Sequence, residues 1–198
     1  MTFEEEILDF SKDIIHKKRG ITTEETTKIA LVLPFLKKLG YDTENPDELK
    51  AEYAADVGVK KSEKVDFAVL IDGEVQMIIE CKPVSVNLTS NHLEQLQRYY
   101  SVSDVKIAVL TNGAVYQFFT DFDSPGRMDG APFLEVDLRN LGDRQIESLA
   151  LFRRDNFNLD KILDHVEELK YRQGIHDALL GEIKNPDDDL IRLISRRV

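Results

Sequence analysis

The spacing of apolar residues predicts two helices at the start of the chain. Residues 3–18 carry apolar side chains at helical intervals, namely Phe3, Ile7, Phe10 and Ile14. A second helical pattern covers residues 23–39. A glycine, a residue that commonly ends helices, follows each pattern, at Gly20 and at Gly40.

Runs of apolar and β-branched residues predict a sheet in the middle of the chain. Two of its connections are Asp72-Gly73 and Asn112-Gly113, dipeptides that favour tight hairpins. A helix is expected between the third and fourth strands, from residue 90 or 91 to residue 100. The predicted strands cover residues 52–57, 65–71, 75–82, 106–110, 114–120 and 133–138.

The last part of the chain again has a helical pattern. It falls into segments beginning at Asp143, at residues 159–171 and at residues 175–194, the last interrupted by Pro186. The order of helices, strands and helices predicts an α/β (α+β) fold. We expect its core to cover residues 1–142 and a helical C-terminal extension to cover residues 143–198.

Composition and charge exclude several classes of protein. No apolar run is long enough to span a bilayer, and the acidic N-terminus lacks the basic start of a secretion signal, so we expect a cytoplasmic protein without a membrane partner. The single cysteine, Cys81, cannot form an internal disulfide. No phosphate-loop or dinucleotide-binding motif is present, so the chain carries no ATP-driven motor of its own.

The net charge bears on nucleic-acid binding. A formal net charge of -11 argues against a protein that holds DNA by bulk electrostatics. Lys60, Lys61 and Lys64, however, cluster directly before the strand predicted at residues 65–71. This cluster is either a substrate-binding patch or an ordinary solvated surface.

The most informative feature is a set of charges among residues that favour burial. Asp66 lies on one predicted strand, and Glu80 and Lys82 lie on the next, where they share a face. A two-residue loop between the strands would place Asp66 opposite Ile79, facing away from Glu80. A three-residue loop over residues 71–73, or a β-bulge, would place Asp66 on the side of Glu80.

Two carboxylates that converge in this way favour a divalent cation. At a separation of about 4 Å their repulsion is roughly 4 kcal/mol at an effective dielectric constant near 20. Oxygen ligands suit Mg²⁺ or Mn²⁺, and Lys82 would lie close enough to orient or deprotonate a metal-bound water, or to stabilise charge on a phosphate. The alternative is a cross-strand ion pair between Asp66 and Lys82 on a solvated sheet face.

These residues also carry a resemblance to known nucleases. Val65-Asp66, followed after thirteen residues by Glu80-Cys81-Lys82, resembles the catalytic motif of the PD-(D/E)-x-K nuclease superfamily, with Val65 in place of the proline. Residues 22–42 (TTEETTKIALVLPFLKKLGYD) and 52–70 (EYAADVGVKKSEKVDFAVL) resemble the N-terminal nuclease domain of type I restriction enzyme R subunits. The resemblance covers residues 22–157.

The resemblance implies a fold and a function. The fold is a restriction-endonuclease-like core, a central mixed sheet flanked by helices, with residues 1–142 as the nuclease domain. The function is Mg²⁺-dependent (or Mn²⁺-dependent) hydrolysis of DNA phosphodiester bonds in restriction or phage defence, with other restriction-system subunits as partners. Asp66, Glu80 and Lys82 would be the catalytic residues, and Asp66 and Glu80 would hold the metal.

Three further residues acquire candidate roles from the same resemblance. Glu25 would support the metal site, because helical spacing places it on the face that carries Ile29 and Val32. The alternative is a helix cap, since Thr22 and Glu25 have the spacing of a capping box. Gln95 and Tyr99 resemble a Q-x-x-x-Y motif that orients substrate, whereas a tyrosine on an amphipathic helix is otherwise a core residue.

A different class of function is also consistent with the sequence. The chain can keep a nuclease fold and act without catalysis, as a module for DNA binding or subunit assembly. The helices after Asp143 would then provide the docking surface. Titration with Mg²⁺ separates the two functions, because only the catalytic module is expected to bind the metal at Asp66 and Glu80.

Overall fold

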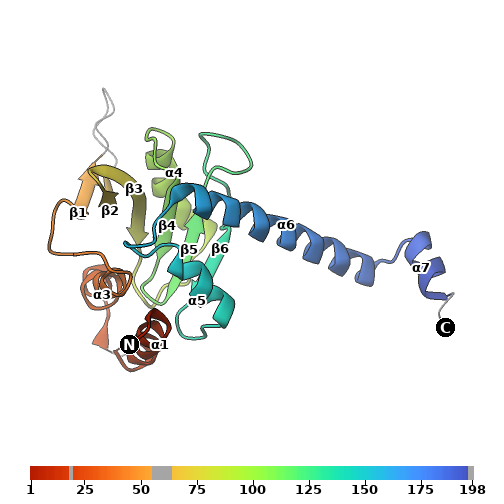
Figure 1. Ribbon diagram of the computed structural model, residues 1–198, viewed down its shortest axis with the longest axis horizontal. Helices are drawn as coiled ribbons and strands as arrows, with labels where there is room; N and C mark the ends of the chain where they lie inside the picture. Colours follow the sequence, from red (N-terminus) through yellow and green to blue (C-terminus); the bar gives the residue numbers. More distant parts are fainter. Residues whose placement is uncertain (18–19, 55–63, 196–198) are drawn as a thin grey trace.

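The computed structural model describes residues 1–17, 20–54 and 64–195. The structure is a mixed sheet with helices on both faces and a long helix that leaves the body of the molecule toward the C-terminus (Figure 1). The predicted α/β fold, with a mixed sheet flanked by helices and a C-terminal helical extension, is therefore confirmed.

Six strands form the sheet in the order in which they occur along the chain. All neighbouring strands are antiparallel except β3 and β4, which are parallel because the chain crosses back over the sheet between them through η3 and α4. The carboxyl ends of β3 and β4 therefore lie side by side. The strands are β1 (Leu49–Ala54), β2 (Lys64–Ile71), β3 (Glu74–Cys81), β4 (Ile107–Thr111), β5 (Val115–Phe119) and β6 (Leu134–Asp137).

The helices follow the predicted order. The turn at Asn112-Gly113 joins β4 to β5 as expected, with Gly113 at a φ of 77° that glycine adopts readily. The helices are α1 (Phe3–Lys17), α2 (Glu24–Thr27), η2 (Lys28–Val32), α3 (Leu33–Lys38), η3 (Ser90–Leu93), α4 (Glu94–Tyr100), α5 (Asp143–Ala150), α6 (Leu159–Lys184) and α7 (Asp188–Ser195).

Most described boundaries lie within one residue of the prediction, and two differ by more. The first strand begins at Leu49 instead of residue 52. The break predicted between residues 171 and 175 is wrong, since α6 continues through Gly174. A single glycine inside a long helix costs only about 1 kcal/mol, too little to end the helix.

Each face of the sheet has its own hydrophobic core. Strand alternation places Met77, Ile79 and Cys81 in the larger core, under α1, η2, α3, α5 and the first half of α6. Ile78 belongs to the smaller core, which η3 and α4 cover. Glu80 and Lys82 share strand parity with Ile78, so they continue this second face beyond the apolar part of β3.

The helix predicted over residues 23–39 contains a π-helical turn, η2, between α2 and α3. The N–H of Leu33 bonds to the carbonyl of Lys28, five residues earlier. Pro34 follows directly, and its ring has no N–H to donate to the carbonyl of Ala30. The π turn adds one residue to the helical repeat, so residues before it are rotated by about 100° from the position that an uninterrupted α-helix would give them.

Candidate functional site

The β2–β3 hairpin sets the position of Asp66 relative to Glu80. Its loop is the two-residue turn Asp72-Gly73, and both residues have positive φ, 53° and 84°. A register shift between Val69 and Leu70 adds one residue to β3, which is the bulge expected from the sequence as one of two ways to align the site. Extending the observed register past Phe67, which pairs with Ile79, brings Asp66 opposite Glu80.

Both carboxylate oxygens of Asp66 have hydrogen-bond partners. Oδ2 accepts a hydrogen bond from the backbone N–H of Cys81 at 2.6 Å, which ties the side chain to the end of β3. Oδ1 lies 2.5 Å from Nζ of Lys28 on the helix over the sheet. The Asp66 side chain is therefore held beside the peptide that joins Glu80 to Cys81.

Glu80 is the most deeply buried carboxylate of the group, with a side chain only 3% exposed. Its Oε1 accepts a hydrogen bond from Nζ of Lys82 at 2.6 Å. Its Oε2 is buried and has no hydrogen-bond partner among the residues that the structure describes. Burial raises the pKa of Glu80 to about 7, and the nearby charge of Asp66 adds to the increase, while the hydrogen bond from Lys82 opposes it.

Lys82 is held in its charged form. Burial lowers the pKa of its ammonium group, but the hydrogen bond to Glu80 and the surrounding carboxylates outweigh burial and raise the pKa above its usual value. A charged ammonium cannot accept a proton. In this state Lys82 is suited to stabilise negative charge, and not to act as a base.

Lys28 is a site residue that the sequence interpretation missed. Its buried ammonium group lies 2.8 Å from Oε1 of Glu25 and 3.5 Å from Oε1 of Glu24, in addition to its contact with Asp66. Burial lowers its pKa, yet the hydrogen bonds to Asp66 and Glu25 raise the pKa above its usual value. A lysine four residues after Glu24, followed by the proline at position 34, is the pattern that could have indicated it.

The helix around Lys28 is fixed to the chain just after strands β3 and β4. The side-chain oxygen of Thr27 accepts a hydrogen bond from the N–H of Val84, just after β3. A Cβ added to Gly113, just after β4, would lie 2.8 Å from Cβ of Leu31. Glycine is therefore needed at this turn both for its positive φ and for the close approach of η2.

The comparisons with known proteins identify the family. Residues 23–130, more than half of the chain, match the family described as the type I restriction enzyme R protein N terminus. The chain belongs to this family. No curated protein and no solved structure matches the chain.

In this R-protein N-terminal domain, Glu25 does not take the predicted inward position. Its side chain is 74% exposed, whereas Glu24 is half-buried, the reverse of the expectation. The π turn explains the difference, because it rotates residues before Lys28 relative to the core-facing Val32. The predicted capping box is also wrong, since Thr23 caps the helix and its partner is Thr26.

Gln95 and Tyr99 of the R-protein domain make packing contacts. Nε2 of Gln95 donates a hydrogen bond to the backbone oxygen of Lys64 at 2.7 Å, which fixes α4 to the start of β2. Tyr99 is buried in the smaller core, with its ring centroid 6.1 Å from that of Tyr53. A role for either residue in substrate binding stays a prediction.

The predicted lysine cluster is described only in part. Lys60 and Lys61 lie outside the residues that the structure describes. Lys64 opens β2, and its exposed ammonium group lies 3.8 Å from the carboxylate of Glu52. Lys64 precedes Asp66 by two residues on the same strand, and a role for Lys64 in substrate binding stays a prediction.

The R-protein domain offers oxygen ligands for a metal, but few of them. Over residues 1–17, 20–54 and 64–195, no three His, Cys, Asp or Glu side chains are arranged so that they could hold an ion. The charges of Asp66 and Glu24 both act on Glu80, and Oε2 of Glu80, which has no partner within residues 1–17, 20–54 and 64–195, is the atom best suited to a cation. Mg²⁺ and Mn²⁺ fit such a site because they keep several waters and need only one or two carboxylates from the protein.

One further structural finding concerns the helices. None of those that the structure describes combines the length and the apolar character needed to cross a membrane.

Proposed function

We propose that this R-protein N-terminal domain is a Mg²⁺-dependent endonuclease that hydrolyses DNA phosphodiester bonds in a restriction system. The observation that carries the proposal is the buried Oε2 of Glu80 beside Asp66 and Lys82, which has no hydrogen-bond partner in the part of the chain that the structure describes. A carboxylate oxygen buried without a partner costs free energy, and a divalent cation would remove that cost. Membership of the restriction R-protein family supports the same function.

Asp66, Glu80 and Lys82 would have different roles in the reaction. Asp66 and Glu80 would hold Mg²⁺ or Mn²⁺, which when bound supplies positive charge and acidifies a water. Glu80, buried with a pKa near 7, is ready to lose its proton when a cation approaches. Lys82 would direct its ammonium group at the phosphate and stabilise the negative charge that develops there.

The acidity of the chain supports a need for partners. A net charge of -11 repels a polyanion, and the described site contributes only a few cations. We therefore expect DNA to be delivered by other restriction-system subunits, with the metal and Lys82 making the contacts at the bond that is cut. Cleavage by the isolated chain should be slow and should increase when partner subunits are added.

Plasmid cleavage tests this function. Purified protein with supercoiled DNA should convert it to nicked or linear forms with Mg²⁺ and not with EDTA, and Lys82→Ala should reduce the rate at least about 100-fold. Lys37→Ala is the matched control, because Lys37, which lies on α3, forms an exposed ion pair with Glu44. Cleavage that persists in Lys82→Ala, or the absence of metal-dependent cleavage with partner subunits present, would overturn the proposal.

A second candidate function is assembly without catalysis. The observation that favours it is the row of exposed apolar side chains on α6 and α7, which the body of the molecule does not cover. Calorimetric titration with Mn²⁺ separates the two functions. Heat of binding that disappears in Glu80→Gln supports the nuclease, whereas the absence of binding in the wild-type chain supports assembly.

A further inference from the structure

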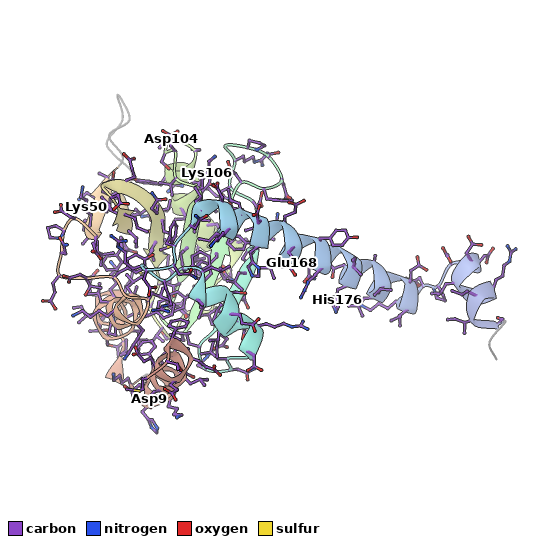
Figure 2. The ribbon with its side chains drawn as sticks, in the orientation of Figure 1. Asp9, Lys50, Asp104, Lys106, Glu168 and His176 are labelled. Atoms are coloured by element: carbon purple, nitrogen blue, oxygen red, sulfur yellow. The ribbon has the colours of Figure 1, made fainter. Side chains whose placement is uncertain are left out.

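The long helix α6 changes its surroundings halfway along its length. Its first half packs on the larger core through Ile162 and Val166, which are fully buried. Beyond Lys170 it projects from the body of the molecule, as the positions of Glu168 and His176 in Figure 2 show. The projecting half still carries large apolar side chains that are exposed, namely Tyr171, Ile175, Leu179, Leu180 and Ile183.

Four residues of the projecting half form a seam along one side of the helix. Arg172, Ile175, Leu179 and Glu182 follow one another at intervals of three, four and three residues, the spacing of a coiled-coil contact. Tyr171 flanks the seam near one end. A helix with such a face is only marginally stable alone in water, and an exposed apolar face of this kind marks a contact with another protein surface.

We propose that a second copy of this chain covers the seam, with the two α6 helices antiparallel and related by a two-fold axis. The seam is symmetric in sequence about position 177. An antiparallel copy therefore places Ile175 against Leu179 of the partner subunit, while Tyr171 and Ile183 lie on opposite flanks of the seam. This self-complementary arrangement is the one that a two-fold interface requires.

Charge selects the antiparallel arrangement over the parallel one. Arg172 and Glu182 lie at opposite ends of the seam, so an antiparallel copy pairs Arg172 with Glu182 of the partner subunit twice, once at each end. A parallel copy would place like charges together. In the single chain Arg172 already pairs with Glu168 at 2.7 Å, but both side chains are more than half exposed, so exchanging this partner costs little.

The exposed apolar residues suit a small and reversible interface. Ile175 and Leu179 face the partner and Tyr171 and Ile183 flank them, whereas Leu180 lies on another side of the helix, so the contact belongs to the small, transient class of interfaces. We therefore expect a dimer that dissociates at micromolar concentrations. The inference depends on none of the residues of the candidate nuclease site, so either one can fail without the other.

Sedimentation of the whole chain over the micromolar range tests the dimer. The wild-type chain should shift from monomer to dimer with increasing concentration, and Ile175→Glu combined with Leu179→Glu should stay monomeric with the same thermal unfolding of the core. Arg172→Glu should weaken the dimer about tenfold or more, and adding Glu182→Arg should restore it. Lys184→Glu, outside the seam, is the matched control and should change dimerisation little.

Disulfide cross-linking tests the orientation. A mixture of the Ile175→Cys and Leu179→Cys variants should form a mixed cross-linked dimer faster than either variant cross-links with itself, because position 175 faces position 179 of the partner subunit. A parallel pair would reverse this preference. The proposal is overturned by faster self-cross-linking, by a chain that stays monomeric, or by a dimer that the Arg172→Glu and Glu182→Arg pair fails to restore.

Discussion

Two clusters of carboxylates and lysines in this protein use the same residue types in different ways. The site cluster joins Asp66 and Glu80 to Lys28 and Lys82 at the ends of the sheet strands. The loop cluster, in the connection between β5 and β6, joins Asp121, Asp123 and Asp129 to Lys106 and Lys170. Both are partly buried, so the comparison concerns how completely the carboxylate oxygens are satisfied.

The loop cluster satisfies its buried carboxylates. Asp129 accepts from the N–H of Asp123 at 3.0 Å with one oxygen and from Lys170 at 2.6 Å with the other. Asp121 accepts from Lys106 at 2.9 Å and from the N–H of Gly126 at 2.6 Å. Burial raises the pKa of Asp121, but these two donors outweigh it and hold the pKa below its usual value.

In the site cluster, one oxygen of Glu80 has no partner among the described side chains and backbone groups, and the pKa of Glu80 is raised to about 7. A fully satisfied cluster fixes a loop to α6, which is a structural role. An incompletely satisfied cluster retains the capacity to bind something further. The number of acidic residues alone therefore does not distinguish the two clusters, whereas the hydrogen-bond partners of their buried carboxylate oxygens do.

The largest expected effect is that of Lys28→Met on the site cluster. Removing this buried ammonium group leaves Asp66 without its counterion, so the free energy of unfolding should fall by about 3 kcal/mol, as for other broken buried ion pairs. Urea denaturation measures the change, with Lys37→Met as the control for an exposed lysine. Mn²⁺ should stabilise the variant more than the wild type. A loss below about 1 kcal/mol would show that Lys28 is not essential to the cluster.

Glu80→Gln should change the pH dependence of stability. The pKa of Glu80 is raised from 4.5 in the unfolded chain to about 7 in the folded chain. The free energy of unfolding that protonated Glu80 contributes is therefore fully present below about pH 4.5 and is lost as the pH rises through 7. Relative to the glutamine variant, the wild type should lose about 2 kcal/mol between pH 5 and pH 8. Urea denaturation at both pH values measures this, and parallel pH profiles for the two proteins would contradict it.

Asp129→Asn tests whether the loop cluster is structural. The amide oxygen can still accept from the N–H of Asp123, but Lys170 loses its buried partner, so we expect a loss of about 1.5 kcal/mol. Lys170 also contacts Asp123 at 2.9 Å, which limits the effect. Hydrogen exchange should show faster opening of the loop, while plasmid cleavage should be unchanged. Lower cleavage at equal stability would give the loop a functional role.

The smallest expected effect is that of Lys106→Met. Its side chain is 41% exposed, so its ion pair with Asp121 is screened by water and should contribute only about 0.5 kcal/mol to stability. Thermal unfolding is the measurement, and Asp121 keeps its hydrogen bond from Gly126. A loss as large as that of Lys28→Met would show that the two clusters are equally dependent on their lysines.

Much of the fold was predictable because it depends on local patterns. Helical and strand periods located α1, the hairpin at Asn112-Gly113 and the β2–β3 pair to within a few residues. The residue types at positions 66, 80 and 82 predicted the chemistry of the site, which stays a prediction, and family membership agrees with the restriction R-subunit resemblance. These features depend on neighbours in sequence, so the sequence by itself determined them.

Other features depended on the tertiary structure. A single added residue in β3 places Asp66 opposite Glu80, and the sequence allowed two ways to achieve this. A single added residue in η2 turns Glu25 outward, and the contact of Lys28 with Asp66 is one that the sequence interpretation missed. One inserted residue changes the direction of every side chain beyond it, and whether it is inserted depends on packing and hydrogen bonds between segments far apart in the chain. The sequence therefore indicated Asp66, Glu80 and Lys82, and only the tertiary structure decided that Lys28 joins them and that Glu25 is exposed.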